Sequence, residues 1–106
     1  MREFYVYILT NKKHTVLYTG VTGNLYERVR QHKAGKGSKF TSRYHTNKLV
    51  YLETYENAYD AISRKKQIKA GSRQDKLNLI NEMNPRWKDL LDDLTYWLFI
   101  MKAILV

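Results

Sequence analysis

The stretch Val16–His32, VLYTGVTGNLYERVRQH, decides the fold, because it changes from strand character to helix character around two glycines. Its first residues are mostly β-branched or aromatic, which favours a strand ending at Gly20. Four later residues recur at helical spacing and share one face: Leu25, Arg28, Val29 and His32. The stretch therefore predicts a strand, a turn and a helix that bring Tyr18, Arg28 and His32 to one corner.

The turn in this stretch contains residues that begin helices. Thr22-Gly23-Asn24 is typical of a turn, and Asn24 is the expected N-cap of the helix. Glu27 follows three residues later, so the pair is predicted to form an Asn-x-x-Glu variant of the capping box. The helix is expected to run to about Lys33, with Glu27 in a structural role.

A second predicted strand precedes this corner. Phe4–Thr10, FYVYILT, is aromatic and β-branched, which predicts a largely buried strand. The polar residues Asn11–Thr15 are expected to form a hairpin loop. Tyr7 and Tyr18 are about equally far from the loop centre, so the hairpin should place them nearly opposite each other.

The rest of the chain predicts one more strand and several helices. Residues 34–47 are expected to form a long basic loop, and Leu49–Tyr55 a third strand. Asn57 and Asp60 predict the start of a helix ending near Gly71, with its inner stripe formed by Ala58, Ala61, Ile62 and Ile68.

Ser72 is predicted to cap a further helix that runs to about Met83. Asn84-Pro85 should break it, and Pro85 is the expected first residue of a final helix through Trp87, Leu90, Leu91 and Leu94.

The composition favours a nucleic-acid partner. The 106 residues suit one domain and carry a formal net charge of +9, with 10 Lys/Arg against 2 Asp/Glu in residues 1–50. The chain has no cysteine, which excludes disulfides, Cys-type zinc sites and a Cys nucleophile and agrees with a cytoplasmic location. We expect a nucleic acid as the partner, no small-molecule substrate and no transmembrane segment.

Two clusters of basic residues are the predicted nucleic-acid-binding residues. The first consists of Arg30, Lys33, Lys36, Lys39 and Arg43, and the second of Arg64, Lys66 and Lys69, with Arg73 and Lys76 following. Such side chains bind phosphates without reading sequence, and their affinity falls with salt. Phe40 and Tyr44 interleave with the first cluster and either stack on unpaired bases or pack the loop onto the domain. No side chain is an evident reader of base edges, so we predict weak sequence preference.

The ordered motifs resemble the GIY-YIG nuclease superfamily, and specifically the small single-domain members related to the N-terminal domain of the excision-repair nuclease. The matching motifs are Tyr5-Val6-Tyr7, Tyr18-Thr19-Gly20, the helix stretch from Leu25 to His32, the run from Ser63 to Lys69, and Asn84-Pro85-x-Trp87-x-x-Leu90. The resemblance covers residues 4 to about 94. It implies an α/β (α+β) fold in which a three-stranded antiparallel sheet is flanked by helices.

The resemblance also implies a reaction and roles for residues. The superfamily cuts DNA with a divalent metal, Mg²⁺ or Mn²⁺. Tyr7 would activate the attacking water, Tyr18 would be the second tyrosine of the cleft, Arg28 would hold the scissile phosphate, and His32 would line the same cleft. These four are the predicted catalytic residues, and Gly20 would allow close backbone approach at the strand end.

One position departs from the superfamily pattern. The glutamate that holds the metal corresponds to Lys65 in the run RKKQIK, and an ammonium group cannot ligate magnesium. Lys65 also lies on the predicted inner stripe of its helix, where a lysine is anomalous in a core and better explained by a cleft. No metal-binding residue is therefore predicted.

Three explanations for Lys65 stay open. Cleavage is lost or severely weakened with binding retained; another carboxylate, from Glu53, Glu56 or Asp60, takes over; or the Lys65 ammonium replaces part of the metal's charge. The first function hypothesis is thus a metal-dependent endonuclease that selects DNA structure more than sequence, and the second a DNA-binding module with a disabled site.

A third hypothesis concerns the end of the chain. We divide the chain into a nuclease-like domain over residues 1–94 and an apolar C-terminal tail over residues 95–106, TYWLFIMKAILV. The tail is too short to span a bilayer. It is expected to pack on the domain or on a second copy as a homodimer, to attach to a membrane surface, or to aggregate.

Overall fold

The computed structural model describes residues 3–92, and its centre is a three-stranded antiparallel sheet. The strands are β1 (Phe4–Thr10), β2 (Leu17–Thr22) and β3 (Lys48–Tyr55), in the order β2-β1-β3. β1 is rich in aromatic and aliphatic residues because it is the central strand and is covered on both faces. The predicted sheet and fold class are confirmed.

The register of the hairpin differs from the expectation for the two tyrosines. Tyr7 pairs with Gly20, and Tyr18 pairs with Leu9. The prediction that the tyrosines lie opposite each other is wrong by one diagonal step, because Thr10 pairs with Leu17 and fixes the centre of the loop between residues 13 and 14. Both tyrosines still lie on the same face of the sheet, within the reach of diagonal neighbours.

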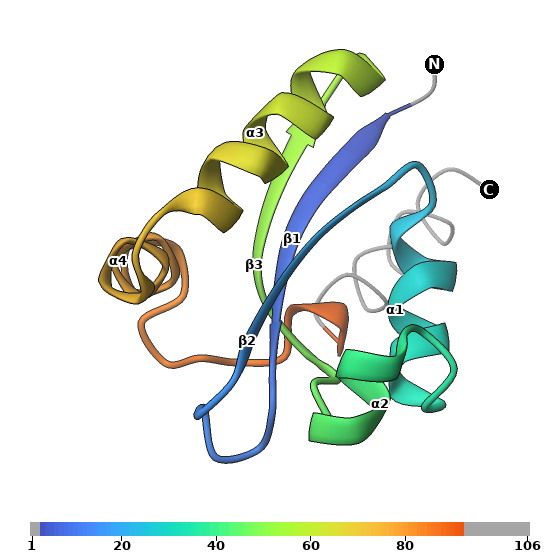
Figure 1. Cartoon of the computed structure of the whole chain (residues 1–106), viewed down its shortest axis with the longest axis vertical. Helices are drawn as coiled ribbons and strands as arrows, with labels where there is room; N and C mark the ends of the chain where they lie inside the picture. The colour runs from blue at the N-terminus through green and yellow to red at the C-terminus, as the bar shows by residue number, and fades with distance from the viewer. Residues whose placement is uncertain (1–2, 93–106) are drawn as a thin grey trace, which may run out of the picture.

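The two faces of the sheet carry separate cores. On one face Val6, Ile8 and Tyr51 pack with α3 (Ala58–Ala70) and α4 (Arg73–Met83). On the other face Tyr7 and Leu9 pack with residues of α1 (Leu25–Lys33). Figure 1 shows α3 and α4 on one side of the sheet and α1 with α2 on the other. Alternate residues of β1 therefore serve different helices.

Side chains predicted as N-caps begin the helices. Asn24, Asn57 and Ser72 accept hydrogen bonds from the backbone three residues later, at α1, α3 and α4. The capping box predicted with Glu27 is wrong, because the Asn24 N–H is bound by the hydroxyl of Thr22 instead.

The region predicted as one long basic loop contains a helix. α2 spans Lys39–Tyr44 and begins at Ser38, whose hydroxyl accepts from the Thr41 N–H while the Thr41 hydroxyl accepts from the Ser38 N–H. This capping box was hidden in the sequence because the helix has only six residues and shows no apolar period.

Two further expectations are wrong in detail. Ala61 and Ile68 of α3 are buried as predicted, but Ile62 is 41% exposed because the helix turns it away from the sheet. Pro85 does not begin a helix: the Trp87 N–H bonds back to the Asn84 carbonyl in a turn, and helical residues resume at Leu90.

Among residues 3–92, no helix is both long and apolar enough to cross a membrane. The tail from Thr95 and the predicted helical position of Leu94 lie outside the described residues, so the homodimer and the other predicted roles of the tail stay predictions.

Candidate functional site

The four predicted catalytic residues meet on the α1 face of the sheet. The Tyr7 hydroxyl lies 3.2 Å from Nε2 of His32, and the Tyr7 and Tyr18 ring centroids are 6.5 Å apart. The Tyr18 and His32 rings are separated by 5.5 Å. The guanidinium of Arg28, one helical turn before His32, lies close enough to Tyr7 to lower the pKa of the phenol. The corner predicted from the sequence is thus formed by β1, β2 and α1.

Two glycines permit this close packing. A Cβ atom at Gly20 would lie 2.4 Å from the Tyr7 hydroxyl oxygen, and one at Gly37 would lie 2.0 Å from Nδ1 of His32. Both distances are far below van der Waals contact. Gly20 was predicted to allow close backbone approach, whereas Gly37 was missed because its partner His32 lies on another element.

Burial controls the ionisation of Tyr7. Desolvation of the nearly inaccessible side chain raises the pKa of Tyr7 to about 12, and the nearby Tyr18 adds to this rise. The Arg28 guanidinium lowers the pKa but does not outweigh burial. The lowered pKa that would suit a phenol acting as a base on water is therefore absent at this tyrosine.

His32 is the buried centre of the site. Its side chain is 2% exposed, and Nδ1 lies 2.9 Å from the Thr41 hydroxyl of α2. Desolvation, followed by the charge of Arg28, lowers the pKa of His32 to about 4. The imidazole is therefore neutral near pH 7, and its two hydrogen bonds join α1 to α2 and to β1.

The residues of the cleft do not fit a divalent metal. Residues 3–92 contain no group of three or more His, Asp or Glu side chains that could hold a metal ion. Lys65 occupies the expected glutamate position on α3 and is half-buried. Magnesium prefers carboxylate, carbonyl and water oxygens. Tyr7, Arg28 and His32 supply a protonated phenol, a guanidinium and an imidazole, and none of these groups is a carboxylate.

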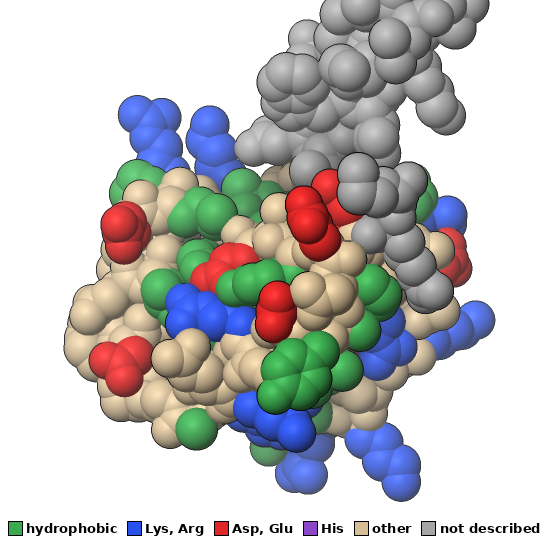
Figure 2. All heavy atoms as spheres, turned by 90° about the horizontal axis from the view of Figure 1, so that it is seen from above, with side chains coloured by type: hydrophobic (Ala, Val, Ile, Leu, Met, Phe, Trp, Pro, Cys, Tyr) green, Lys and Arg blue, Asp and Glu red, His purple; other side chains and the backbone are tan. Residues whose placement is uncertain are grey.

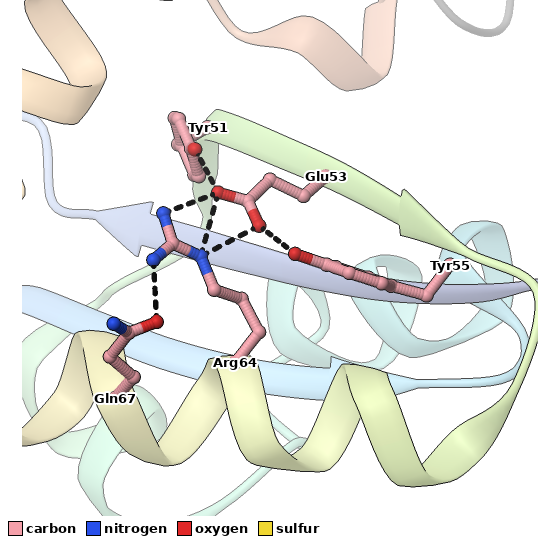
Figure 3. A network of polar contacts seen from close by, with 5 residues as sticks. All are labelled: Tyr51, Glu53, Tyr55, Arg64 and Gln67. Atoms are coloured by element: carbon pink, nitrogen blue, oxygen red, sulfur yellow. Dashed lines mark hydrogen bonds and ion pairs between the residues drawn. The ribbon is translucent and has the colours of Figure 1, made fainter.

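Glu53, one of the three carboxylates considered as a substitute, is engaged elsewhere. Glu53 of β3 accepts hydrogen bonds from Arg64 at 3.0 and 3.2 Å through Nε, and from the hydroxyls of Tyr51 and Tyr55. Figure 3 shows Arg64 reaching from α3 to Glu53, with Gln67 holding its other end. Glu53 lies on the α3 face, and its oxygens are occupied by this network.

The predicted nucleic-acid-binding residues divide into paired and exposed side chains. Lys33 forms an ion pair with Asp89, and Arg64 forms one with Glu53. The remaining predicted residues lie in exposed positions: Arg30, Lys36, Lys39, Arg43, Lys66 and Lys69. The exposed set is therefore the part with charge available to a partner.

An aromatic cluster borders the site at the edge strand. The ring centroid of Phe40 lies 6.0 Å from that of Tyr18, on which it stacks, and 4.9 Å from that of Tyr44. Packing onto the domain, one of the two roles predicted for these rings, is therefore observed. Phe40 and Tyr44 nevertheless stay 43% and 41% exposed. Their outer faces remain accessible.

A cavity of about 360 Å³ lies beside this cluster. It is lined by Leu17, Tyr18, Thr19, Phe40, Lys69 and Lys76. Lys76 donates to the Gly71 carbonyl at 2.7 Å, where α3 ends. The Thr19 hydroxyl is buried and makes no hydrogen bond within the described residues. The sequence did not show that lysines of α3 and α4 come next to Tyr18, because the contact crosses the β2 edge.

Both α1 and α3 carry acidic residues at their start and basic residues at their end. The first turns of α1 and α3 contain Glu27 and Asp60, and their last turns contain Arg30, Lys33 and Lys69. Figure 2 looks onto the end where these helices begin, and acidic side chains are spread over that face. Three of the predicted binding residues, Arg30, Lys33 and Lys69, therefore lie at the opposite ends of these helices.

The sequence comparison identifies the domain. The model of the GIY-YIG catalytic domain matches residues 3–78. The chain belongs to the GIY-YIG family. This membership indicates a nuclease-like domain that acts on DNA, and nucleases of the family generally depend on a divalent metal.

Relatives and a solved structure agree with this family. A UPF0213 protein of Staphylococcus haemolyticus is 43% identical over 82 residues, which cover 77% of this chain and 99% of the relative. A UPF0213 protein of Clostridium perfringens is 47% identical over 77 residues, covering 73% and 82%. The solution NMR structure of a UPF0213 protein from Bacillus halodurans aligns with a TM-score of 0.53 at 29% identity, covering 82% of this chain and 92% of that one.

Proposed function

We propose that this GIY-YIG domain binds the phosphodiester backbone of DNA in the Tyr7/Tyr18/Arg28/His32 cleft, and that metal-dependent cleavage is lost or greatly weakened at Lys65. The observation that carries the proposal is the half-buried Lys65 at the position where the superfamily has its metal-binding glutamate. Glu53, the nearby carboxylate on the strand that packs with α3, is already bound by Arg64.

The cleft has the chemistry of a phosphate site without a metal. Arg28 presents a guanidinium, which donates hydrogen bonds to two oxygens of one phosphate. Lys69 adds a cation on the other side of Tyr18. With the pKa of Tyr7 at about 12 and that of His32 at about 4, neither group is poised to take a proton from water near pH 7. The residues of the site therefore support phosphate binding better than they support catalysis.

The second candidate is a metal-dependent endonuclease that selects DNA structure. It is favoured by the intact assembly of Tyr7, Tyr18, Arg28 and His32, since a pure binding module has no need to keep a buried tyrosine–histidine pair. In this case a divalent metal would be held by groups outside the described cleft or by the DNA itself.

A third possibility, slow cleavage assisted by the Lys65 ammonium, makes a separate prediction. A lysine can offset charge on a leaving oxygen without a metal. Such cleavage would be insensitive to chelators, and strict metal dependence would exclude it.

The exposed rings of Phe40 and Tyr44 support contact with unpaired bases beside the cleft. Base stacking on aromatic rings contributes about 1–3 kcal/mol per base and tolerates any sequence. DNA that offers unpaired bases, such as branched DNA, should therefore bind more tightly than blunt duplex, with weak sequence preference.

The experiment that tests the proposal compares Lys65→Glu with the wild-type protein on supercoiled and branched DNA in Mg²⁺ or Mn²⁺. Lys65→Gln is the matched control, because it removes the ammonium at the same position without supplying a carboxylate. We expect wild type and Lys65→Gln to bind without cutting, and Lys65→Glu to cut. Metal-dependent cutting by wild type at the rate of Lys65→Glu would support the endonuclease instead. Absence of DNA binding by wild type would refute both.

A further inference from the structure

The hydrogen bonds around His32 determine which of its nitrogens carries the proton. The Arg28 guanidinium lies beside the Tyr7 phenol and lowers its pKa, and a guanidinium accepts no proton from a hydroxyl. The Tyr7 hydroxyl proton then needs an acceptor of its own. Within the described residues, Nε2 of His32 lies at 3.2 Å and is the acceptor in reach. Nε2 is therefore unprotonated.

The other ring nitrogen must then be the donor. A neutral imidazole carries one proton, so Nδ1–H donates to the Thr41 hydroxyl oxygen at 2.9 Å. That oxygen also accepts the Ser38 N–H at 3.1 Å, which fills its two lone pairs. The Thr41 hydroxyl donates its own proton to the Ser38 carbonyl oxygen at 3.3 Å, so it has no proton left for Nδ1. The bonds form one directed chain from Tyr7 to Ser38.

We infer that Thr41 is a positioning residue of this site: its hydroxyl fixes the Nδ1–H tautomer of His32 and so leaves Nε2 to accept the proton of Tyr7. The inference rests on the proposed function only in assigning Thr41 to the same cleft. It extends the proposed function by making α2 part of the site.

The surroundings of Thr41 agree with this role. Thr41 is 1% exposed, although a threonine that only capped a short surface helix would have no need for burial. Gly37 leaves no space for a side chain against His32 Nδ1, so the backbone before α2 closes over the ring. The same helix presents Phe40 and Tyr44 on its exposed side. α2 therefore joins these exposed rings on one side to the hydrogen bond with His32 on its other side.

The test is the tautomer of His32, read from the ¹⁵N spectrum of the uniformly labelled protein at pH 7. The variants His14→Gln and His45→Asn assign the remaining imidazole signals to His32. Thr41→Val keeps the shape of the side chain and removes the hydroxyl, and Thr41→Ser keeps the hydroxyl. We expect Nδ1–H in wild type and Thr41→Ser, and loss of this pattern in Thr41→Val.

An Nε2–H tautomer in wild type would overturn the inference, as would an unchanged Nδ1–H tautomer in folded Thr41→Val. If Thr41→Val does not fold, the spectrum of the wild-type protein still tests the inference. We expect a protected Nδ1 proton of His32 with a nuclear Overhauser effect to Thr41. The absence of this signal would overturn the inference. Neither readout uses DNA. Loss of DNA binding with the tautomer intact would count against the proposed function alone.

Discussion

Gly20 lies directly against the ring of Tyr7: a Cβ atom there would come within 2.4 Å of both the ζ-carbon and the hydroxyl oxygen of the phenol. The two residues are cross-strand partners in the β1–β2 hairpin. Tyr7 is 1% exposed and bonded to His32, so it cannot move aside without breaking the centre of the site.

Gly20→Ala should therefore destabilise the protein and displace Tyr7 from His32. Overpacking of a buried position costs about 1–3 kcal/mol. Urea denaturation of both proteins measures the change. Gly71→Ala is the control, because a Cβ atom there would come no closer than 3.2 Å to any neighbour, the Asp75 carboxylate, and it should cost less. Equal losses in the two variants would contradict the role assigned to Gly20.

The neutral, buried His32 should make stability depend on pH. The pKa of His32 is lowered to about 4 when folded, against about 6.5 unfolded, so the unfolded state binds more protons between these values. Stability from this group is present above pH 6.5 and is lost as the pH falls toward 4. From pH 7 to 5 the expected loss is about 2 kcal/mol.

Denaturation curves at pH 7 and pH 5 measure this loss. His32→Gln should flatten the difference, while His45→Asn, on the exposed end of α2, should leave it unchanged. Asparagine suits position 45 because His45 has a φ of 52°, in the left-handed region. A wild-type protein with equal stability at both pH values would show that His32 is not neutral when folded.

Glu53 should be the carboxylate most important for stability. Burial would raise its pKa, but hydrogen bonds from Arg64, Tyr51 and Tyr55 outweigh burial and lower the pKa of Glu53. Glu53→Gln leaves the Arg64 guanidinium without its charged partner, which should cost about 1–3 kcal/mol. The network in Figure 3 also ties α3 to β3.

The pH window of Glu53 is distinct from that of His32. A carboxylate with a lowered folded pKa stabilises above its unfolded pKa, about 4.3, and loses this effect as the pH falls through the folded value. Wild type should therefore lose stability below pH 4.3 more steeply than Glu53→Gln. Glu56→Gln, on the exposed residue after β3, is the control and should behave as wild type. If Glu56→Gln reduces the pH dependence of stability as much as Glu53→Gln does, the network around Glu53 is not its cause.

Local patterns in the sequence predicted the elements well where one residue decides a boundary. Asn24, Asn57 and Ser72 are N-caps in the structure because a short polar side chain before a helical pattern has one favourable use. α2 escaped prediction because six residues give no period, and its cap partner is a threonine. The orientation of Ile62 was also unpredictable, since it depends on how α3 rolls on the sheet.

The site was predictable to the extent that it is local. Arg28 and His32 follow from helical spacing on α1, and Tyr18 from the preceding strand. Thr41, Gly37 and Lys76 were missed as site residues because each reaches the cleft from an element whose place is set by tertiary packing. The Glu53–Arg64 pair was unpredictable for the same reason, because a spacing of 11 residues does not indicate that α3 lies over β3.

Lys69 offers the sharpest test of the DNA path, since it is exposed and lines the cavity beside Tyr18. Its neighbour Lys76 is less suitable, because its ammonium donates to the Gly71 carbonyl and its loss would disturb the end of α3. If Lys69 contacts one phosphate, Lys69→Gln should weaken binding of all DNA sequences and reduce the slope of log K against log salt by about 0.9. Fluorescence titration of a labelled branched oligonucleotide at several salt concentrations measures both effects. Lys13→Gln, on the exposed hairpin loop, removes the same charge away from the cleft. If the two variants lose affinity and slope equally, only net charge matters and the DNA does not pass Tyr18.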